Sequence, residues 1–287
     1  MNYIIVVLQG ILQGLTEFLP VSSSGHLSVF GHFTDMGGEE SLLLIVVLHL
    51  GTLAAVLIAF RETIMGMIKE FFLCIADIFT GRFKWKTMND NRKMLFMTIV
   101  STSVLIPVYL FLKDYFTAPE GDGDIIFEGI AFIFTAVLLF LSDACVKGFK
   151  TGKDMKIKDA FTIGLFQVIA LFPGVSRSGS TITGGLLCGL SRQTAVTFSF
   201  ILGIPAILGG GVLELKSALE SDLQLNYLEL LIGFTVAAVV GFFAIKLVKL
   251  LAKKEKFKIF GVYTAILGVF CIVWGVLEHL DLGIMLF

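Results

Sequence analysis

The sequence predicts an all-α polytopic membrane protein, with six transmembrane helices and two re-entrant helix-loop-helix hairpins in an inverted-topology repeat. Hydrophobic residues make up 56% of the 287 residues and charged residues only 16%, and the mean hydropathy is +0.91. The apolar residues gather in runs long enough to cross about 30 Å of hydrocarbon. This composition excludes an ordinary soluble domain, and the net charge of −1 gives no sign of a nucleic-acid partner.

Six apolar stretches have the length that a membrane-spanning helix needs. They are residues 41–60, 94–112, 125–145, 194–213, 227–248 and 259–277. A further stretch, 63–80, is apolar but is interrupted by Lys69, Glu70 and Asp77, so we expect an amphipathic helix on the cytoplasmic surface there. A seventh span at this position would invert the topology of everything that follows it.

Two other apolar stretches, 3–33 and 160–190, are each broken in the middle by a polar turn. The breaks are residues 20–25 (PVSSSG) and 173–179 (PGVSRSG), and each half is too short to span comfortably. Lipid cannot satisfy the backbone groups that such a break frees, so it is tolerated only where it is buried in protein or lines a watery cavity. We therefore expect two re-entrant hairpins.

Lysine and arginine indicate the orientation of the spans. Of the 22 basic residues, seven lie in 61–93, five in 147–158 and six in 246–258. The positive-inside rule places these three loops in the cytoplasm. The other connections carry mostly acids, including Asp35 and Glu120, and are expected to face outward.

The two hairpins also resemble each other in sequence. A shift of 154 residues aligns Gly10 with Gly164, Gln13 with Gln167, Ser22 with Ser176, Ser24 with Ser178, and Gly25 with Gly179. Three spans separate the hairpins, so the hairpins would enter the membrane from opposite sides and their tips could meet near the midplane. We expect one integral domain over 1–287, with inverted repeats at approximately 1–145 and 155–287 and a binding site at their interface.

The polar tips hold the residues that could carry chemistry. Glu17, His26 and Arg177 are ionisable side chains within membrane segments, where they are costly and by default mark function. Donors surround them: the backbone N–H groups beside Gly25 and Gly179, and the hydroxyls of Ser22, Ser23, Ser24, Ser176, Ser178, Ser180 and Thr181. Such a nest suits a phosphate anion, which an arginine grips with a fork of donors. A serine near His26 and Glu17 would add a nucleophile, a general base and a carboxylate that orients the base or holds a metal.

Residues 13–26 (QGLTEFLPVSSSGH) and 173–181 (PGVSRSGST) resemble the two signature motifs of the bacterial undecaprenyl-diphosphate phosphatases, (E/Q)xxxE and PGxSRSxxT. The resemblance covers essentially the whole chain. It implies hydrolysis of undecaprenyl diphosphate to undecaprenyl phosphate and inorganic phosphate at the outer face of the bacterial cytoplasmic membrane, which recycles the carrier lipid for peptidoglycan synthesis. It also implies resistance to bacitracin, which competes by binding the lipid substrate.

Carried over by position, the resemblance implies a catalytic group of Glu17, Ser23, His26 and Arg177. The expected substrate-binding residues are Gln13, Ser22, Ser24, Gly25, Ser176, Ser178, Gly179 and Thr181. A divalent cation, Mg²⁺ or Ca²⁺, is the implied cofactor. Because position 13 is Gln where many relatives have Glu, a metal would rely on Glu17, the substrate's diphosphate oxygens and water.

Several alternatives remain open from the sequence. Ser23 could attack the terminal phosphorus with His26 as base, or water could attack directly. An inverted repeat with a midplane site is also a transporter plan, so the chain could be a flippase for an anionic prenyl phosphate. In a purely structural alternative, Glu17 and Arg177 form a buried pair that locks the hairpins together. His49 is expected to have a structural or interfacial role, and a homodimer remains open because the sequence does not indicate the oligomeric state.

Overall fold

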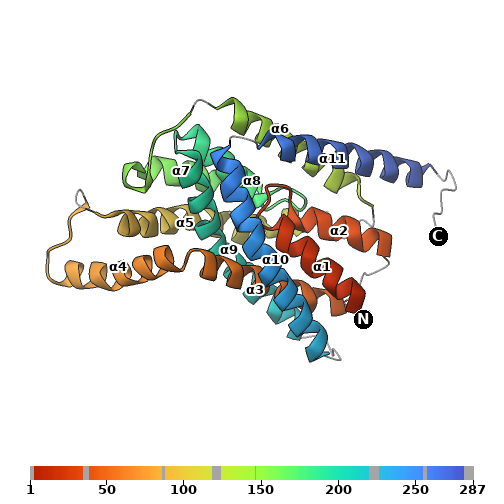
Figure 1. Ribbon diagram of the computed structural model, residues 1–287, viewed down its shortest axis with the longest axis horizontal. Helices are drawn as coiled ribbons and strands as arrows, with labels where there is room; N and C mark the ends of the chain where they lie inside the picture. The colour runs from red at the N-terminus through yellow and green to blue at the C-terminus, as the bar shows by residue number, and fades with distance from the viewer. Residues whose placement is uncertain are drawn as a thin grey trace.

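The computed structural model describes residues 3–34, 39–85, 88–117, 124–145, 147–219, 226–254 and 257–280. Within these ranges the chain folds into α-helices, a short 3-10 helix at Gly152–Asp154 and no named strand, so the expectation of an all-helical protein is confirmed (Figure 1). The α-helices are α1 (Tyr3–Thr16), α2 (Ser23–Thr34), α3 (Glu39–Ala59), α4 (Arg61–Phe79), α5 (Asp90–Thr117), α6 (Ile126–Ala144), α7 (Ile157–Ile169), α8 (Arg177–Leu187), α9 (Arg192–Leu219), α10 (Tyr227–Lys253) and α11 (Lys258–His279).

Five helices are long and apolar enough to cross a membrane: α5, α6, α9, α10 and α11. They coincide with five of the six expected spans. The sixth candidate is α3 together with α4, a pair bent by 84° at Phe60. This bend separates the expected span 41–60 from the stretch 63–80. The chain is therefore a multi-pass membrane protein with five to six apolar spans among its described residues.

The two expected breaks separate four short helices. The chain leaves helical geometry between α1 and α2 and again between α7 and α8. Ser22 and Gly174, one in each break, have φ angles of 73° and 81°. Glycine takes this left-handed conformation readily, whereas serine is strained in it. Such strain persists only where the surrounding structure holds it in place.

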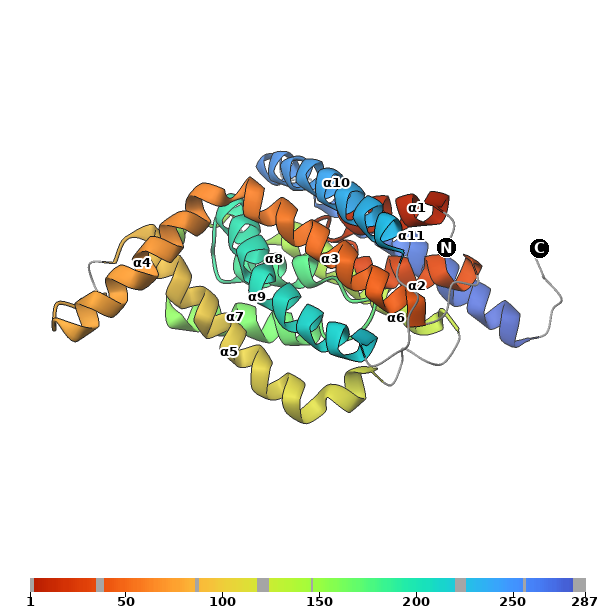
Figure 2. The same cartoon turned by 90° about the horizontal axis from the view of Figure 1, so that it is seen from below.

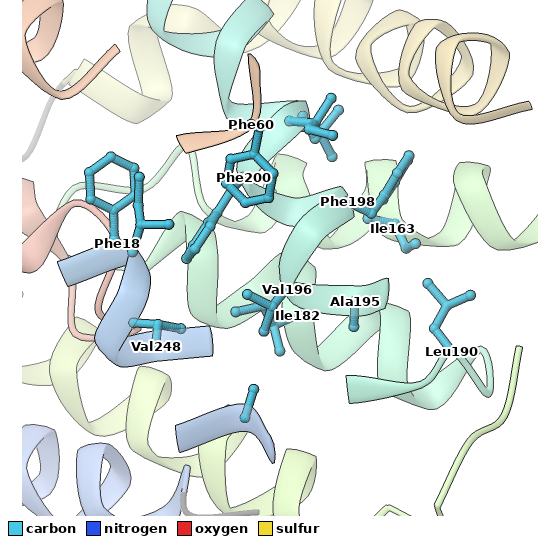
Figure 3. Close-up of a cluster of buried hydrophobic side chains, with 14 of the residues drawn as sticks. Phe18, Phe60, Ile163, Ile182, Leu190, Ala195, Val196, Phe198, Phe200 and Val248 are labelled. Atoms are coloured by element: carbon cyan, nitrogen blue, oxygen red, sulfur yellow. The ribbon is translucent and has the colours of Figure 1, made fainter. Parts of the chain in front are cut away.

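The largest hydrophobic core lies beside the first break. Phe18 packs edge-on against Phe200 of α9 with ring centroids 5.4 Å apart, and Phe200 meets Phe60 at 6.1 Å (Figure 3). On the other side of Phe18, a Cβ on Gly241 of α10 would lie 2.8 Å from the Phe18 ring. The buried Phe18 therefore fixes the position of its neighbour Glu17 against α9 and α10.

The short helices α1 and α7 each lie against a long helix from the other half of the chain. α1 packs on α10, and α7 packs on α5 (Figures 1 and 2). The contact is close in both cases: a Cβ on Gly10 would lie 3.0 Å from Val236, and one on Gly164 would lie 2.8 Å from the Ser101 carbonyl oxygen. Any larger side chain at either glycine would push the two helices apart.

The three basic loops lie at one end of the helix bundle. Asp143, at the end of α6, accepts a hydrogen bond from the Lys258 backbone N–H at 2.6 Å. Gly152 lies next to Asp90, because a Cβ there would be 3.6 Å from the Asp90 carboxylate. Two of the acidic residues that we expected at the opposite end, Asp35 and Glu120, lie outside the described residues.

Candidate active site

A cavity of about 220 Å³ opens where the two breaks meet. Polar groups line it from three sides: Glu17 and residues 22–24 of the first break, residues 176–178 of the second, and His49 of α3. The remaining wall includes small and apolar residues of α9 between 206 and 211. The structure therefore brings most of the site residues that we expected from the sequence to one cavity.

Glu17 and Arg177 form an ion pair across the two breaks. Arg177 Nη2 donates to Glu17 Oε1 at 2.5 Å, and the two side chains are only 17% and 7% exposed. Arg177 Nη1 also donates to the Ser199 carbonyl oxygen at 3.3 Å. A Cβ on Gly203 would lie 2.2 Å from Nη1, so the guanidinium lies directly against the backbone of α9. Glycine at 203 is thus a condition for the position of Arg177.

Ser23, the first residue of α2, shares this carboxylate. Its hydroxyl donates to Glu17 Oε2 at 2.7 Å, and Gln13 Nε2 donates to the same oxygen at 3.1 Å. Both oxygens of Glu17 therefore already accept hydrogen bonds. The Ser23 hydroxyl is held at the cavity wall with an acceptor in place for its proton.

Serines also cross-link the two breaks. The Gly174 backbone N–H donates to Ser24 Oγ at 3.3 Å, and Ser178 Oγ donates to the Leu19 carbonyl oxygen at 3.3 Å. A Cβ on Gly25 would lie 3.0 Å from the Gly174 Cα. The close approach of the breaks therefore requires glycine at 25.

The other expected binding residues lie behind this wall. The N–H groups of Gly25 and Gly179 donate to Ser22 Oγ at 3.3 Å and Ser176 Oγ at 3.1 Å, so they do not stand free for a ligand as the sequence led us to expect. Thr181 Oγ1 donates to the Arg177 carbonyl oxygen at 2.8 Å. The expected binding residues that support the cavity without lining it are therefore Gln13, Gly25, Gly179 and Thr181.

His26 faces away from the serine hydroxyls. Its Nδ1 lies 2.6 Å from the Ser22 carbonyl oxygen, and its Nε2 lies 2.8 Å from the Tyr263 hydroxyl. A carbonyl oxygen only accepts, so Nδ1 carries the proton and Nε2 of the neutral ring accepts from Tyr263. The bond to Ser22 holds the strained backbone of the turn. In this geometry neither ring nitrogen reaches Ser23.

His49 lines the cavity, whereas the sequence led us to expect a structural or interfacial role for it. Its Nδ1 lies 2.9 Å from the Ile45 carbonyl oxygen, so by the same reasoning the neutral ring carries its proton there. Nε2 lies 3.9 Å from Glu17 Oε2 and retains its lone pair. The signal available in the sequence was a histidine in the middle of an apolar span, which by itself marks function in a membrane.

The cavity does not contain a complete metal site. Among the described residues, no group of three or more His, Cys, Asp or Glu side chains is placed to hold a metal ion. Glu17 is the one carboxylate in the cavity lining, and both of its oxygens are engaged. Ca²⁺ takes six to eight oxygen ligands and Mg²⁺ takes six, so the protein alone supplies too few for a resident cation.

Known proteins resemble this chain over nearly its whole length. The family of bacitracin resistance protein BacA matches residues 6–270. An undecaprenyl-diphosphatase of Alkaliphilus metalliredigens is 42% identical over 272 residues, which cover 94% of this chain and 98% of that protein. An undecaprenyl-diphosphatase of Methanobrevibacter smithii is 38% identical over 280 residues, which cover 98% of this chain and 100% of that protein.

Proposed function

This chain belongs to the BacA family of bacitracin resistance proteins, and on that premise we propose that it hydrolyses undecaprenyl diphosphate to undecaprenyl phosphate and inorganic phosphate. The observation that carries the proposal is the cavity in which Arg177, Glu17 and Ser23 of the two breaks meet. An arginine fork and a serine nucleophile are groups that phosphoryl transfer uses. The activity would recycle the carrier lipid for peptidoglycan synthesis and counter bacitracin, which binds the substrate.

We place the cavity on the outer face of the bacterial cytoplasmic membrane. The basic loops share one end of the bundle, which the positive-inside rule makes cytoplasmic. α9 begins at that end, because Arg192 pairs with Asp143 at 2.9 Å. The cavity is lined by Gly210 and Gly211, about eighteen residues further along α9 and therefore roughly 27 Å along its axis. This distance supports an opening toward the outer leaflet.

We also propose that the breaks are the tips of re-entrant hairpins in an inverted repeat of 1–145 and 155–287. α1 and α7 begin at Tyr3 and Ile157, and α2 and α8 begin at Ser23 and Arg177, so both pairs are 154 residues apart. The aligned glycines 10 and 164 make equivalent close contacts, the first with α10 and the second with α5. In each half, the first short helix packs against a long helix of the other half, and this symmetry supports an internal repeat.

In the first chemical step, Ser23 Oγ attacks the terminal phosphorus of the substrate. The bond from that phosphorus to the bridging oxygen breaks, and undecaprenyl phosphate leaves. Glu17 accepts the Ser23 proton, since the hydrogen bond between them is already 2.7 Å long. Arg177 moves its donors from Glu17 to the phosphoryl oxygens and stabilises their charge. His26 positions the turn that carries Ser23, in place of the role as base that the sequence suggested.

In the second step, water hydrolyses the phosphoserine and releases inorganic phosphate. His49 supplies the base for this water, because its Nε2 lone pair lies at the cavity wall close to Glu17. A neutral imidazole with a free ring nitrogen is a common general base in enzymes. Glu17 returns its proton to the Ser23 oxygen as the bond from that oxygen to phosphorus breaks, His49 gives the proton taken from water to the solvent, and the enzyme returns to its starting state.

Replacement of His49 by glutamine should slow this second step selectively. His49→Gln retains a hydrogen-bonding side chain but removes the base, so we expect turnover to fall by about a hundredfold and phosphoserine to accumulate during the reaction. Because the first step is unchanged, KM should fall together with kcat and kcat/KM should stay close to the wild-type value. Rapid quench with substrate labelled in the terminal phosphate measures the rate of phosphate release and the amount of phosphoserine. His32→Gln is the matched control, because His32 bonds to Glu278 away from the cavity. Unchanged turnover in His49→Gln would remove His49 from the mechanism.

We propose that the divalent cation arrives with the substrate. A diphosphate brings several negatively charged oxygens, whereas the cavity offers Arg177 and one carboxylate. When bound, the cation would neutralise part of the diphosphate charge, with Glu17 as its nearest protein carboxylate. The protein residues would bind and orient the substrate around it.

The decisive test is phosphate release by purified protein in detergent, with farnesyl or undecaprenyl diphosphate as substrate. We expect release that a chelator abolishes and added Mg²⁺ or Ca²⁺ restores. Because the apo protein holds no complete metal site, the chelator should leave its melting temperature without substrate unchanged within about 1 °C. Failure of the well-folded protein to release phosphate, where no second leaflet exists, would favour the transporter alternative.

A further inference from the structure

One face of α9 forms an apolar wall that starts beside Arg177 and continues along the active-site cavity. Five residues at the three- and four-residue spacing of a single helix face make up this α9 wall. They are Gly203, Ala206, Ile207, Gly210 and Gly211. The last four line the cavity, and the first lies against the Arg177 guanidinium. None of the five has a polar side chain, in contrast to the serines and charged groups on the other sides of the cavity.

Gly210 and Gly211 leave open space in the α9 wall. A Cβ on either residue would meet no atom of the described part of the chain within 4 Å. Packing therefore does not require glycine at these two positions, whereas a Cβ on Gly203 would collide with Arg177. Glycine also destabilises a helix relative to every other residue except proline. Because the fold gains nothing from the two glycines, the space that they leave indicates a bound group.

The position of the α9 wall indicates the chemistry of that group. From Gly203, beside the Arg177 guanidinium, the helix rises about 12 Å to Gly211. A ligand with its phosphate at Arg177 would therefore have an open apolar surface leading away from the phosphate. Inorganic phosphate alone would leave this surface in contact with water. A phosphate that carries an apolar chain would cover it, which the hydrophobic effect favours.

We propose that the α9 wall binds the part of the prenyl chain that follows the diphosphate of the substrate, and that Gly210 and Gly211 leave the room through which a long chain passes. This inference rests on the proposed function, which places the diphosphate at Arg177. A side chain at position 210 would occupy the space of the prenyl chain. The two glycines therefore determine specificity, because they let the site accept a chain of several isoprene units.

The experiment fills this space in two steps, with the neighbouring Gly209 as the matched control. Gly210→Ala adds a small side chain and Gly210→Leu a large one. Gly209→Leu adds the large side chain to the preceding residue, which also has no described atom within 4 Å of its Cβ position but does not line the cavity. Alanine and leucine are better helix formers than glycine, so none of the three variants should melt at a lower temperature than the wild type.

Two measurements on the purified full-length protein in detergent test the proposal. Phosphate release gives kcat/KM for farnesyl diphosphate, which has three isoprene units, and for dimethylallyl diphosphate, which has one. We expect the ratio of these two values to fall by at least about tenfold in Gly210→Leu and to stay within about twofold of wild type in Gly210→Ala and Gly209→Leu. Calorimetric titration with farnesyl phosphate measures binding of the chain without turnover, and its affinity should follow the same order.

The outcomes separate the α9 wall from the hydrolysis itself. An unchanged ratio and an unchanged affinity for farnesyl phosphate in Gly210→Leu would overturn the proposal. Equal losses in Gly210→Ala and Gly210→Leu would also overturn it, because α9 would then need glycine for its backbone freedom and not for space. If the wild type releases no phosphate but farnesyl phosphate binds in the expected order, the proposed hydrolysis fails and the binding of the chain by α9 stands.

Discussion

Ser23→Ala is expected to lower the rate of phosphate release by at least about a thousandfold, because it removes the nucleophile of the proposed mechanism. The structure gives Ser23 two properties of such a nucleophile. Its hydroxyl lies at the cavity wall, and it is hydrogen-bonded to Glu17 at 2.7 Å. Substrate affinity should change much less, since Arg177 and the other serines of the cavity remain. Steady-state kinetics in detergent would show the loss in kcat.

Ser28→Ala is the matched control for this experiment. Ser28 lies on the same helix α2, and its hydroxyl also donates to a buried glutamate, Glu128 Oε1, at 2.7 Å. It does not line the cavity. The control should therefore keep turnover within about twofold of wild type, since it loses one hydrogen bond of similar strength and no reacting group. If Ser23→Ala retained more than about a tenth of wild-type turnover, Ser23 could not be the nucleophile.

Direct attack by water on the terminal phosphorus is the main alternative to attack by Ser23. Ser23→Ala alone does not distinguish these two mechanisms. Acid quench of the His49→Gln variant with substrate labelled in the terminal phosphate does. A covalent mechanism leaves label on Ser23, whereas direct attack leaves all of it in free phosphate. Label on Ser23 that exceeds the wild-type level would also show that His49 acts after the first transfer.

Much of the fold could be predicted because a membrane imposes length and charge rules on the chain. Five of the described helices coincide with expected spans, and both expected breaks fall where a proline follows an apolar run. Pro107 and Pro205 also lie in apolar runs, yet α5 and α9 continue through them. Neighbouring helices can satisfy the backbone groups that a proline frees. The polar residues after Pro20 and Pro173, more than the prolines themselves, were therefore the informative signal.

The site was harder to predict, because contacts between distant segments decide it. Ser23, Glu17 and Arg177, which come from two local motifs, lie together around one cavity. The orientation of His26 depends on Tyr263, which lies 237 residues later in the chain. The approach of His49 to Glu17 likewise depends on how α3 packs beside the first break. A local motif gives the residue types of a site but does not say which ring nitrogen faces the cavity.

Arg177→Ala should reduce kcat/KM by about three to five orders of magnitude, the range found when an arginine that stabilises a transferring phosphoryl group is removed. The guanidinium is the one permanent positive charge in the cavity lining, and Gly203 and Ser199 fix its position against α9. Arg177→Lys keeps the charge but loses the planar fork. We therefore expect the lysine variant to lie between wild type and alanine. Phosphate release at a range of substrate concentrations measures all three.

A loss of activity in Arg177→Ala has a second physical cause that must be separated from catalysis. Removal of Arg177 leaves Glu17 as a buried, unpaired carboxylate, and breaking a buried ion pair destabilises a protein by about 3 to 5 kcal/mol. Arg92→Ala is the matched control, since Arg92 pairs with Glu70 and Asp77 at 2.7 Å and is 12% exposed, but does not line the cavity. Both variants should melt at lower temperature, and only Arg177→Ala should lose turnover when assayed below its own melting temperature. Equal turnover in the two variants would show that the Glu17–Arg177 pair has only a structural role. The positive charge that stabilises the transferring phosphoryl group would then have to come from another residue or from the cation.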